Sequence, residues 1–275
     1  MTVKRIKKRM LIIPAVLAAL LLLLCYLYYE DNALRATVYH LTSDKVSGEF
    51  TVVQLSDLHS KAFGADNADL IALIDAQDPD LIVDTGDLID DSHFDVADVK
   101  SFESRLTAIA PVCFVTGNHE WESGRAEEVI DALRSCGVRV LRSTAETFTL
   151  RGQTVSVGGT DDIAYTDTYL GDSLKTLTAL PGYRIFLMHQ PQHFSRCAEF
   201  PVDLVLSGHT HGGQVRIPFI GSVFAPNQGF FPHYDWHLFT ENNSTLIISG
   251  GLGTAVLPIR ILAPPEIVVI KVSQK

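Results

Sequence analysis

Five short apolar segments, each followed directly by polar side chains, constrain this chain more than any other feature of its sequence. The segments are Phe50–Asp57, Asp80–Asp87, Pro111–Asn118, Arg184–His189 and Val202–His209. Each is rich in Val, Ile, Leu and Phe, which predicts strands that are buried between other layers. Helical spacing of apolar residues at 67–77, 95–109 and 124–136 separates several of these strands. The pattern as a whole predicts an α/β fold.

Shorter runs complete the expected sheets. Segments within Val138–Gly159, and later the runs "QVRI", "TLIISGG" and "EIVVIKV", are typical of antiparallel strands. No internal repeat or low-complexity tract interrupts the chain.

The ends of the five strands carry side chains that strands themselves do not need. They are Asp57 and His59, then Asp87, then Asn118, His119 and Glu120, then His189, and finally His209 and His211. A single Asp or His at a strand end usually forms a cap or a turn. Because ligands of open α/β sheets gather outside the carboxyl ends of the strands, five such ends in order favour one shared site.

Imidazole, carboxylate and amide groups without thiolates suit Zn, Fe or Mn bound for catalysis, and argue against a structural zinc knot. Two such metals about 3.5–4 Å apart are the usual clamp for phosphoryl transfer. A carboxylate must bridge them, and Asp87 is the natural candidate because Gly86 before it allows a close backbone approach.

The ordered series D-x-H, G-D, G-N-H-E, H and G-H-x-H resembles the calcineurin-like metallophosphoesterases, from Phe50 to about Ile270. The runs "SGHTHGGQVRIPFIG", "APNQGFF" and "GLGTAVLPIRILAPPEIVVI" are similar to a membrane-anchored or exported bacterial subgroup. The resemblance implies a four-layer fold, in which a two-sheet β-sandwich is flanked by helices. It also implies hydrolysis of phosphate esters by a metal-bound water at a dinuclear site.

Carried over residue by residue, the resemblance implies two sets of metal ligands. The first set is Asp57, His59, Asp87 and His211, and the second is Asp87, Asn118, His189 and His209. His209 and His211 are then expected to alternate along an extended segment, with the glycines around them leaving room for the substrate phosphate. His119 is expected beside the metals, as a phosphate ligand or as the acid for the leaving oxygen. Glu120 stands where Asp is commoner, and we expect it to orient His119.

Other functions fit the residues less well. A metal-free binding module on this fold would normally lack ligands that are all present here. A protein serine/threonine phosphatase would want an arginine after the second aspartate motif, where this chain has "GDLIDDSHF". A sugar-nucleotide pyrophosphate hydrolase is the alternative within the same chemistry.

The N-terminus carries a membrane signal. Five basic residues between Lys4 and Arg9 precede the uncharged run Met10–Tyr29, which as a helix would span about 30 Å, the thickness of a bilayer core. Tyrosines at 26, 28 and 29 match an interfacial belt. A cleaved signal peptide is the alternative, but we find no A-x-A-like site after the run. We therefore expect a single-pass anchor with its basic end in the cytoplasm and the catalytic domain outside.

The charge distribution supports this division. All 32 acidic residues lie at Glu30 or later, together with 17 of the 22 basic ones, so the outer part carries a net charge of −15. Such a surface disfavours nucleic acid and anionic lipid, so the anchor rather than charge must hold it to the membrane. We expect a basic tail at 1–9, an anchor at 10–29, a lead-in segment at 30–48 and the metallophosphoesterase domain at 49–275. Anchoring favours substrates of the envelope, such as lipid-linked phosphate esters.

The remaining reactive residues give weaker signals. Cys113, Cys136 and Cys197 are expected as buried thiols, with one disulfide as the alternative. His40, His93 and His193 are expected on the surface. His233 and His237 lie in an aromatic loop that either packs or lines the substrate pocket, and Asp161 and Asp162 are candidates for the pocket rim.

Overall fold

The computed structural model describes residues 2–162, 169–254 and 259–275, with side chains of the first helix described from Ile13 onward. Residues 255–258 of the late "GLGTAVLPIRIL" run and the basic side chains of the tail therefore lie outside the described residues.

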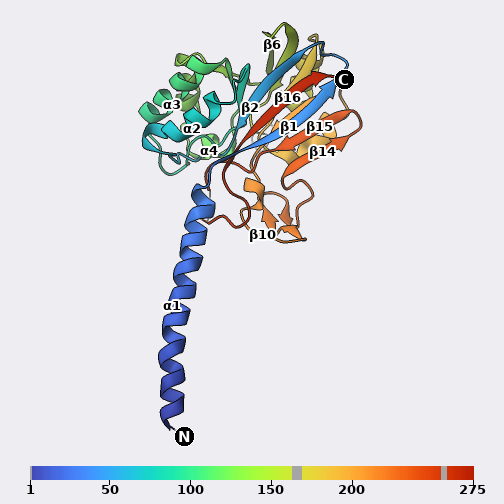
Figure 1. Cartoon of the computed structure of the whole chain (residues 1–275). Helices are drawn as coiled ribbons and strands as arrows, with labels where there is room; N and C mark the ends of the chain where they lie inside the picture. The colour runs from blue at the N-terminus through green and yellow to red at the C-terminus, as the bar shows by residue number, and fades with distance from the viewer. Residues whose placement is uncertain (1, 163–168, 255–258) are drawn as a thin grey trace.

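Two six-stranded sheets form the centre of the molecule (Figure 1). The first has the order β1 (Arg35–Ser43), β16 (Glu266–Gln274), β2 (Glu49–Leu55), β3 (Leu81–Asp84), β4 (Val112–Phe114) and β5 (Arg139–Val140). The second has the order β14 (His237–Glu241), β15 (Ser244–Ile248), β9 (Leu204–Ser207), β8 (Tyr183–Leu187), β7 (Gln153–Gly159) and β6 (Thr144–Leu150). Two small hairpins, β10–β11 (Arg216–Ile217, Gly221–Ser222) and β12–β13 (Phe224–Ala225, Gly229–Phe230), follow β9.

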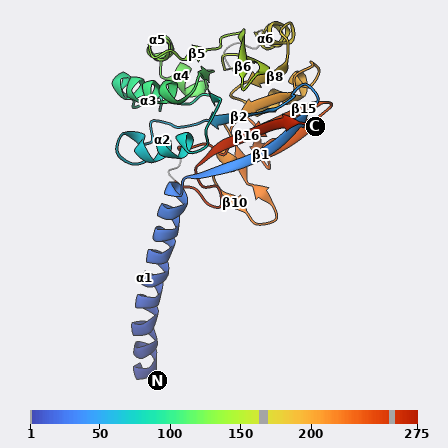
Figure 2. The same ribbon diagram turned by 45° about the horizontal axis from the view of Figure 1, so that its top comes forward.

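Helices cover the outer face of each sheet (Figure 2). The first sheet carries α2 (Ala68–Asp75), α3 (Val96–Ile109), α5 (Ala126–Ser135) and the short α4 (Asn118–Glu122). The second carries α6 (Tyr169–Thr178) and α7 (Phe194–Cys197). Single turns of 3-10 helix lie at Ala65–Asn67, Pro191–His193 and His211–Gly213.

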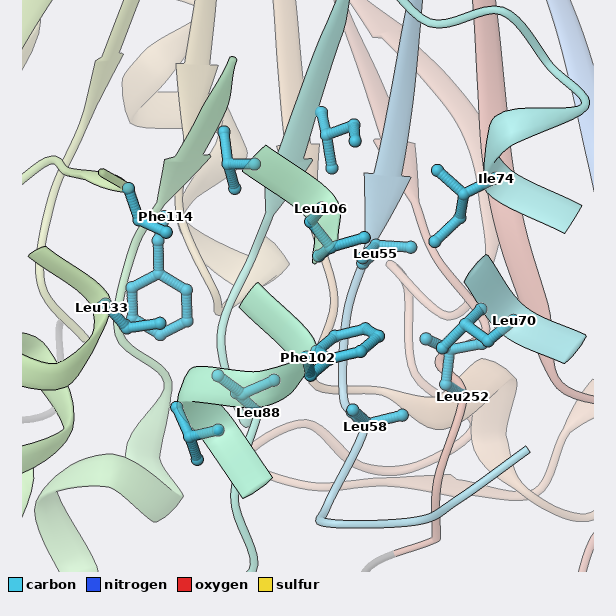
Figure 3. Packing of buried hydrophobic residues seen from close by; sticks show 14 of the residues in the cluster. Leu55, Leu58, Leu70, Ile74, Leu88, Phe102, Leu106, Phe114, Leu133 and Leu252 are labelled. Carbon is cyan, nitrogen blue, oxygen red and sulfur yellow. The ribbon is translucent and has the colours of Figure 1, made fainter. Parts of the chain in front are cut away.

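Three hydrophobic clusters fill the spaces between these layers. In the first, Leu70, Phe102 and Leu106 from the helices pack against Leu55 and Phe114 of the first sheet (Figure 3). The second lies between the two sheets and the third lies between the second sheet and its helices. Central strands such as β3, β4 and β9 are buried on both faces, and their sequences are largely apolar for this reason, as predicted. The four-layer α/β fold is confirmed.

A long N-terminal helix, α1 (Thr2–Asn32), extends away from this body (Figure 1). Among the described residues, one segment of it, Ile13–Asn32, is long and apolar enough to cross a membrane. Its side chains pack against nothing over most of this length, and Leu21, Leu22 and Tyr28 are largely exposed. Length and composition alone support a membrane span here.

Several expectations for strands need correction. Residues 30–48 are not only a lead-in, because β1 pairs with β16 in parallel along its whole length, from Arg35↔Glu266 to Ser43↔Gln274. The run at Arg139–Val140 is parallel to β4 rather than antiparallel, since α5 returns the chain to the same end of the sheet. "TLIISGG" and "EIVVIKV" each have one parallel and one antiparallel neighbour.

The directions of the strands show at which end of the first sheet the polar residues after β2, β3 and β4 lie. β1 leaves the end of α1 and runs parallel to β16, which is antiparallel to β2. β3 and β4 are parallel to β2. The carboxyl ends of β2, β3 and β4 therefore lie at the end of the sheet where β1 starts, which is the side of α1 (Figure 1).

Candidate metal centre

The sequence-predicted residues come together beyond these strand ends. Asp57 and His59 follow β2, Asp87 follows β3, Asn118 and His119 open α4 after β4, His189 follows β8, and His209 and His211 follow β9. The two sheets are joined just behind them, where Gln54 of β2 donates to the Ser207 carbonyl of β9 at 2.9 Å. This bond fixes the spacing between the two halves of the site.

A first cluster consists of Asp57, His59 and His211, whose ligand atoms lie within 4.8 Å of one another. His211 Nε2 is 3.6 Å from Asp57 Oδ1, and the rings of His59 and His211 are 4.9 Å apart. Both nitrogens of His59 and Nδ1 of His211 are buried without a hydrogen-bond partner among the described residues. Buried polar atoms of this kind normally have partners, so the cluster fits a bound cation.

A second cluster consists of Asp87, His189 and His209. His189 Nε2 is 3.1 Å from Asp87 Oδ2, and His209 Nδ1 is 3.1 Å from His189 Nε2. His189 Nδ1 donates to the Thr85 carbonyl at 2.7 Å, which directs its Nε2 toward the cluster. Asn118, the first residue of α4, has a buried amide oxygen that lacks a partner among the described residues.

Asp87 connects the two clusters. One carboxylate oxygen, Oδ2, faces both His189 at 3.1 Å and His59 at 3.7 Å. The other, Oδ1, accepts from the His119 backbone amide at 2.9 Å. Asp57 is held in a similar way, because the His209 amide donates to its two oxygens at 3.0 and 3.1 Å. Each carboxylate is therefore oriented by a backbone amide from a neighbouring loop.

Unusual backbone angles aim these side chains. Asp57, His59, Asp87, His209 and His211 all have positive φ, between 48° and 69°. Non-glycine residues adopt this left-handed region at a cost, and such residues cluster at functional sites. The expected extended His209–His211 segment is wrong: His209 is left-handed and His211 opens a 3-10 turn. The chain turns between the two imidazoles instead of alternating them.

The glycines serve packing within the protein. A Cβ at Gly208 would collide with the side chains of Ser56 and Asp57, and one at Gly213 would collide with Ser222. The expectation that these glycines leave room for a phosphate is therefore wrong for both positions. Gly86 fits its prediction, because a Cβ there would overlap the backbone of Gly117.

Burial sets the charge of the imidazoles. It lowers the pKa of His59 to about 4 and that of His209 to about 3, and it holds the pKa of His211 well below its usual range. For His189 burial also opposes protonation, but Asp87 beside it raises the pKa well above the usual value. Burial raises the pKa of Asp57 to about 6. Three imidazoles are thus neutral at pH 7, the form in which histidine binds metals.

Glu120 does not orient His119, contrary to the sequence prediction. Its fully buried carboxylate accepts from the backbone amides of Asp87 at 3.0 Å, Leu88 at 2.9 Å and Gly117 at 2.7 Å. These hydrogen bonds join the loop after β3 to the loop after β4. Glu is longer than Asp, and its carboxylate reaches the amides of both loops. His119 faces Asp91 instead, with Nδ1 accepting from the Asp91 amide at 3.3 Å. Sequence reasoning missed Asp91, although it lies only four residues after Asp87.

Asp161 and Asp162 are buried supports rather than an open rim. The Asp161 carboxylate accepts a hydrogen bond from Arg142 Nε at 2.8 Å. The Asp162 carboxylate accepts one from the side-chain amide of Gln190 at 2.9 Å. Gln190 follows His189, so this second contact steadies the chain beside the second cluster.

The remaining predicted residues lie outside the centre. His233 packs on Tyr234 and Phe239, and His237 stacks on Trp236, which favours the packed aromatic loop. His40 and His93 are exposed, while His193 is half-buried and was expected on the surface. The described cysteines are free, with Cys113 and Cys197 buried and Cys136 only half-buried because its α5 terminus reaches the surface.

Asn227 is a further residue at the site. It lies between β12 and β13, and its Nδ2 is 3.1 Å from His209 Nε2. Only the run "APNQGFF", noted for its resemblance, pointed to it in the sequence.

A cavity of about 550 Å³ adjoins the loops of the centre. Leu58 and Ser60 line it beside His59, Leu88 lines it beside Asp87, and Lys61 and Phe94 complete that wall. Lys61 also forms an ion pair with Asp31 of α1, at 3.1 Å. Most of the rest of its lining comes from the start of α3 and the start of α5, and no candidate metal ligand lines it.

Known proteins share both the sequence pattern and the fold. Residues 50–213 match the family model described as calcineurin-like phosphoesterase. The uncharacterized metallophosphoesterase YkuE of Bacillus subtilis is 31% identical over 88% of this chain and 86% of its own length. Phosphodiesterase YaeI of Escherichia coli is 32% identical over 64% of this chain and 66% of its own.

Among solved structures, Plasmodium GAP50 is similar in fold alone, with a TM-score of 0.50 at 13% identity over 82% of each chain. The family model covers more than half of this chain and ends at the turn that carries His211. The chain therefore belongs to the calcineurin-like phosphoesterase family, and it is a metal-dependent hydrolase of phosphoric ester bonds.

Proposed function

We propose that the chain hydrolyses phosphate esters at a centre of two divalent metal ions. The observation that carries this proposal is that Asp87 Oδ2 faces an imidazole from each of two buried clusters, His189 and His59. One ion would be held by Asp57, His59, Asp87 and His211, and the other by Asp87, Asn118, His189 and His209. Mn, Fe and Zn all suit this donor set.

The donors fit such ions without rearrangement of the fold. Both nitrogens of His59, Nδ1 of His211 and Oδ1 of Asn118 are buried, and none of them has a hydrogen-bond partner in the part of the chain that the structure describes. Two bound ions would lower the pKa of the attacking water and withdraw charge from the phosphoryl oxygens. The protein supplies the geometry, through the amides that hold Asp57 and Asp87 and the carbonyl that holds His189.

His119 is the proposed proton donor to the leaving oxygen. Its ring lies 4.5 Å from that of His59, edge to face, so it borders the first cluster. To donate a proton the ring must be an imidazolium, whose Nδ1–H would face the Asp91 carboxylate, 3.6 Å away, and which returns to the neutral ring when Nε2 gives its proton to the leaving oxygen. In this arrangement Nε2–H is available to a substrate.

The substrate class follows from the position of the centre. We propose that α1 anchors the chain, with its basic end in the cytoplasm and the domain outside the membrane. The strand ends that carry Asp57, Asp87 and Asn118 lie on the side of α1. The cavity beside them reaches Lys61, which contacts α1. This position favours phosphate esters of the envelope, lipid-linked ones in particular.

The test is a reconstitution of the purified full-length chain. Metal is stripped and replaced by Mn, Fe or Zn, and hydrolysis of nitrophenyl monoesters and diesters is measured before that of envelope phospholipids. We expect activity only with metal, at about two ions per chain by elemental analysis. Full activity with a single ion per chain would contradict the dinuclear centre.

A further inference from the structure

The hairpins that follow His211 expose an unusual set of apolar side chains. This hairpin patch consists of Ile217, Phe219, Ile220, Phe224, Phe230, Phe231 and Leu262. Phe219, at the tip of β10–β11, is fully exposed, and Phe230 and Phe231 are 74% and 66% exposed. Ile217, Phe219, Ile220 and Leu262 line one shallow cavity, and the rings of Phe224 and Phe230 are 5.6 Å apart on the next hairpin. Exposed apolar side chains gathered in this way mark a contact with another protein or with a membrane.

The hairpin patch is continuous with the exposed end of α1. The Tyr26 hydroxyl of α1 interacts with the backbone of Leu262. The neighbouring Ile261 donates to the Gln214 carbonyl at 2.8 Å and accepts from the Arg216 amide at 3.1 Å, at the base of the β10–β11 hairpin. Figure 1 shows this hairpin directed to the same side of the body as α1.

The depth of this contact along α1 identifies the partner. Tyr26 lies six residues before Asn32, the end of α1 and of its apolar segment, which corresponds to about 9 Å along a helix. A bilayer that surrounds α1 up to its last turns would therefore meet Leu262 and the hairpin beside it. Interfacial segments bury their apolar faces about 5–10 Å below the headgroup boundary.

We propose that the hairpin patch lies in the interface of the bilayer that holds α1, as a second membrane contact of the domain. The contact is driven by apolar burial rather than by charge. Arg216, the basic residue nearest the tip, is neutralised by Asp235 at 2.8 Å. The strongly acidic domain offers no general attraction to anionic lipid.

The second contact would also determine how the metal centre faces the membrane. Asn227 lies between Phe224 and Phe230 of the hairpin patch, and it contacts His209 at 3.1 Å. One helix leaves a domain free to swing, whereas a helix and a hairpin together restrict its tilt. The inference rests on the proposed anchor, so its test must report on α1 and on the hairpins separately.

Spin labels in the full-length chain distinguish the two contacts. In a Cys25→Ser, Cys136→Ser background, single cysteines are placed at Leu21 in α1, Phe219 in the hairpin patch and Thr42 near the far end of β1. The protein is reconstituted in phosphatidylcholine nanodiscs, and collisions of each nitroxide with oxygen and with an aqueous nickel chelate are compared. We expect labels at 21 and 219 to collide mainly with oxygen and the label at 42 mainly with nickel.

Each other outcome overturns a defined part of the proposal. A label at 219 as accessible to nickel as the label at 42, with the label at 21 in lipid, would refute the hairpin contact and leave the anchor intact. A label at 21 in water would refute the anchor and the hairpin contact together. Repeating the measurement at Ile220 guards against a local effect of labelling Phe219, and agreement between the two positions is required.

Discussion

The two clusters of the candidate metal centre differ in how firmly the protein holds them. In the second cluster, His189 is bonded to the Thr85 carbonyl, and His209 lies between His189 and Asn227. In the first cluster, His59 has no hydrogen-bond partner among the described residues, and the His211 Nε2 to Asp57 distance is 3.6 Å. Ligands that are held before metal arrives lose less freedom on binding. We therefore expect the second site to bind the tighter ion.

Removing the Asp87 carboxylate, which both proposed sites share, should abolish the difference in metal affinity between them. Asp87→Ala takes a ligand from both proposed sites and leaves two cations without a bridge, so we expect loss of both ions and of activity to background. Elemental analysis and nitrophenyl ester hydrolysis measure the two effects. Asp172→Asn, an exposed carboxylate on α6 paired with Lys175, is the matched control. Two bound ions in an active Asp87→Ala protein would exclude Asp87 as the bridge.

Single histidine variants test the comparison directly. His211→Ala should lose the weaker ion and keep about one tight ion per chain after gel filtration. His189→Ala should lose the tight ion, and its remaining ion should wash out. Asn118→Ala should also deplete the second site, but less severely. Equal retention by the His211 and His189 variants would contradict the difference between the clusters.

Substitution of His119 tests its proposed role as the proton donor beside the first cluster. His119→Asn should keep both ions and slow alkyl phosphate esters by about 10²–10⁴-fold, the usual contribution of a general acid. Nitrophenyl esters should slow much less, because their leaving group needs no proton. An equal loss on both substrates would assign His119 to binding the phosphate, and a loss of metal would make it a ligand.

Metal binding should depend on pH through His189 of the second cluster and Asp57 of the first. In the metal-free protein the pKa of His189 is raised well above its usual value, so this ring carries a proton that metal must displace. Asp57, with a pKa of about 6, competes in the same direction. Affinity should therefore rise between pH 5 and 8, by at most about tenfold per pH unit for each proton displaced. Titration calorimetry in buffers of different ionisation enthalpy measures this release, and a flat affinity would refute it.

The smallest effect is expected for removal of the proposed anchor. Deletion of residues 1–30 keeps β1 and the Asp31–Lys61 ion pair, so the domain should fold as a soluble protein. Hydrolysis of small water-soluble esters should be unchanged within about twofold, since α1 contributes no described residue to the clusters. A truncated chain that fails to fold would show that α1 packing stabilises the domain.

The strands and their polar ends could be predicted because both depend on local sequence. A strand buried on two faces must be apolar throughout, and the residues that end it must then serve another purpose. Asp57, Asp87 and His189 are visible in the sequence for this reason. β1 was missed although its residues alternate, because its partner β16 lies more than two hundred residues away.

The sequence indicated which residues form the metal centre more readily than it indicated the contacts between them. Glu120 binds backbone amides of two loops, and no sequence pattern records where a backbone amide points. The turn at His209 and His211 depends on left-handed backbone angles that tertiary packing imposes. Asn227 comes from a hairpin whose position relative to His209 depends on the fold of the residues between them.

The pairing of β1 with β16 also has a consequence for how the domain is made. β1 is the first strand to follow α1, and its only neighbour in the sheet, β16, is the last strand of the described chain. During synthesis β1 must therefore wait for nearly the whole domain before it finds its partner. Closing so long a loop is slow, and an unpaired strand edge invites association with other chains. A chain stalled before residue 266 would carry this open edge, so release of the C-terminal segment is the step that completes the sheet.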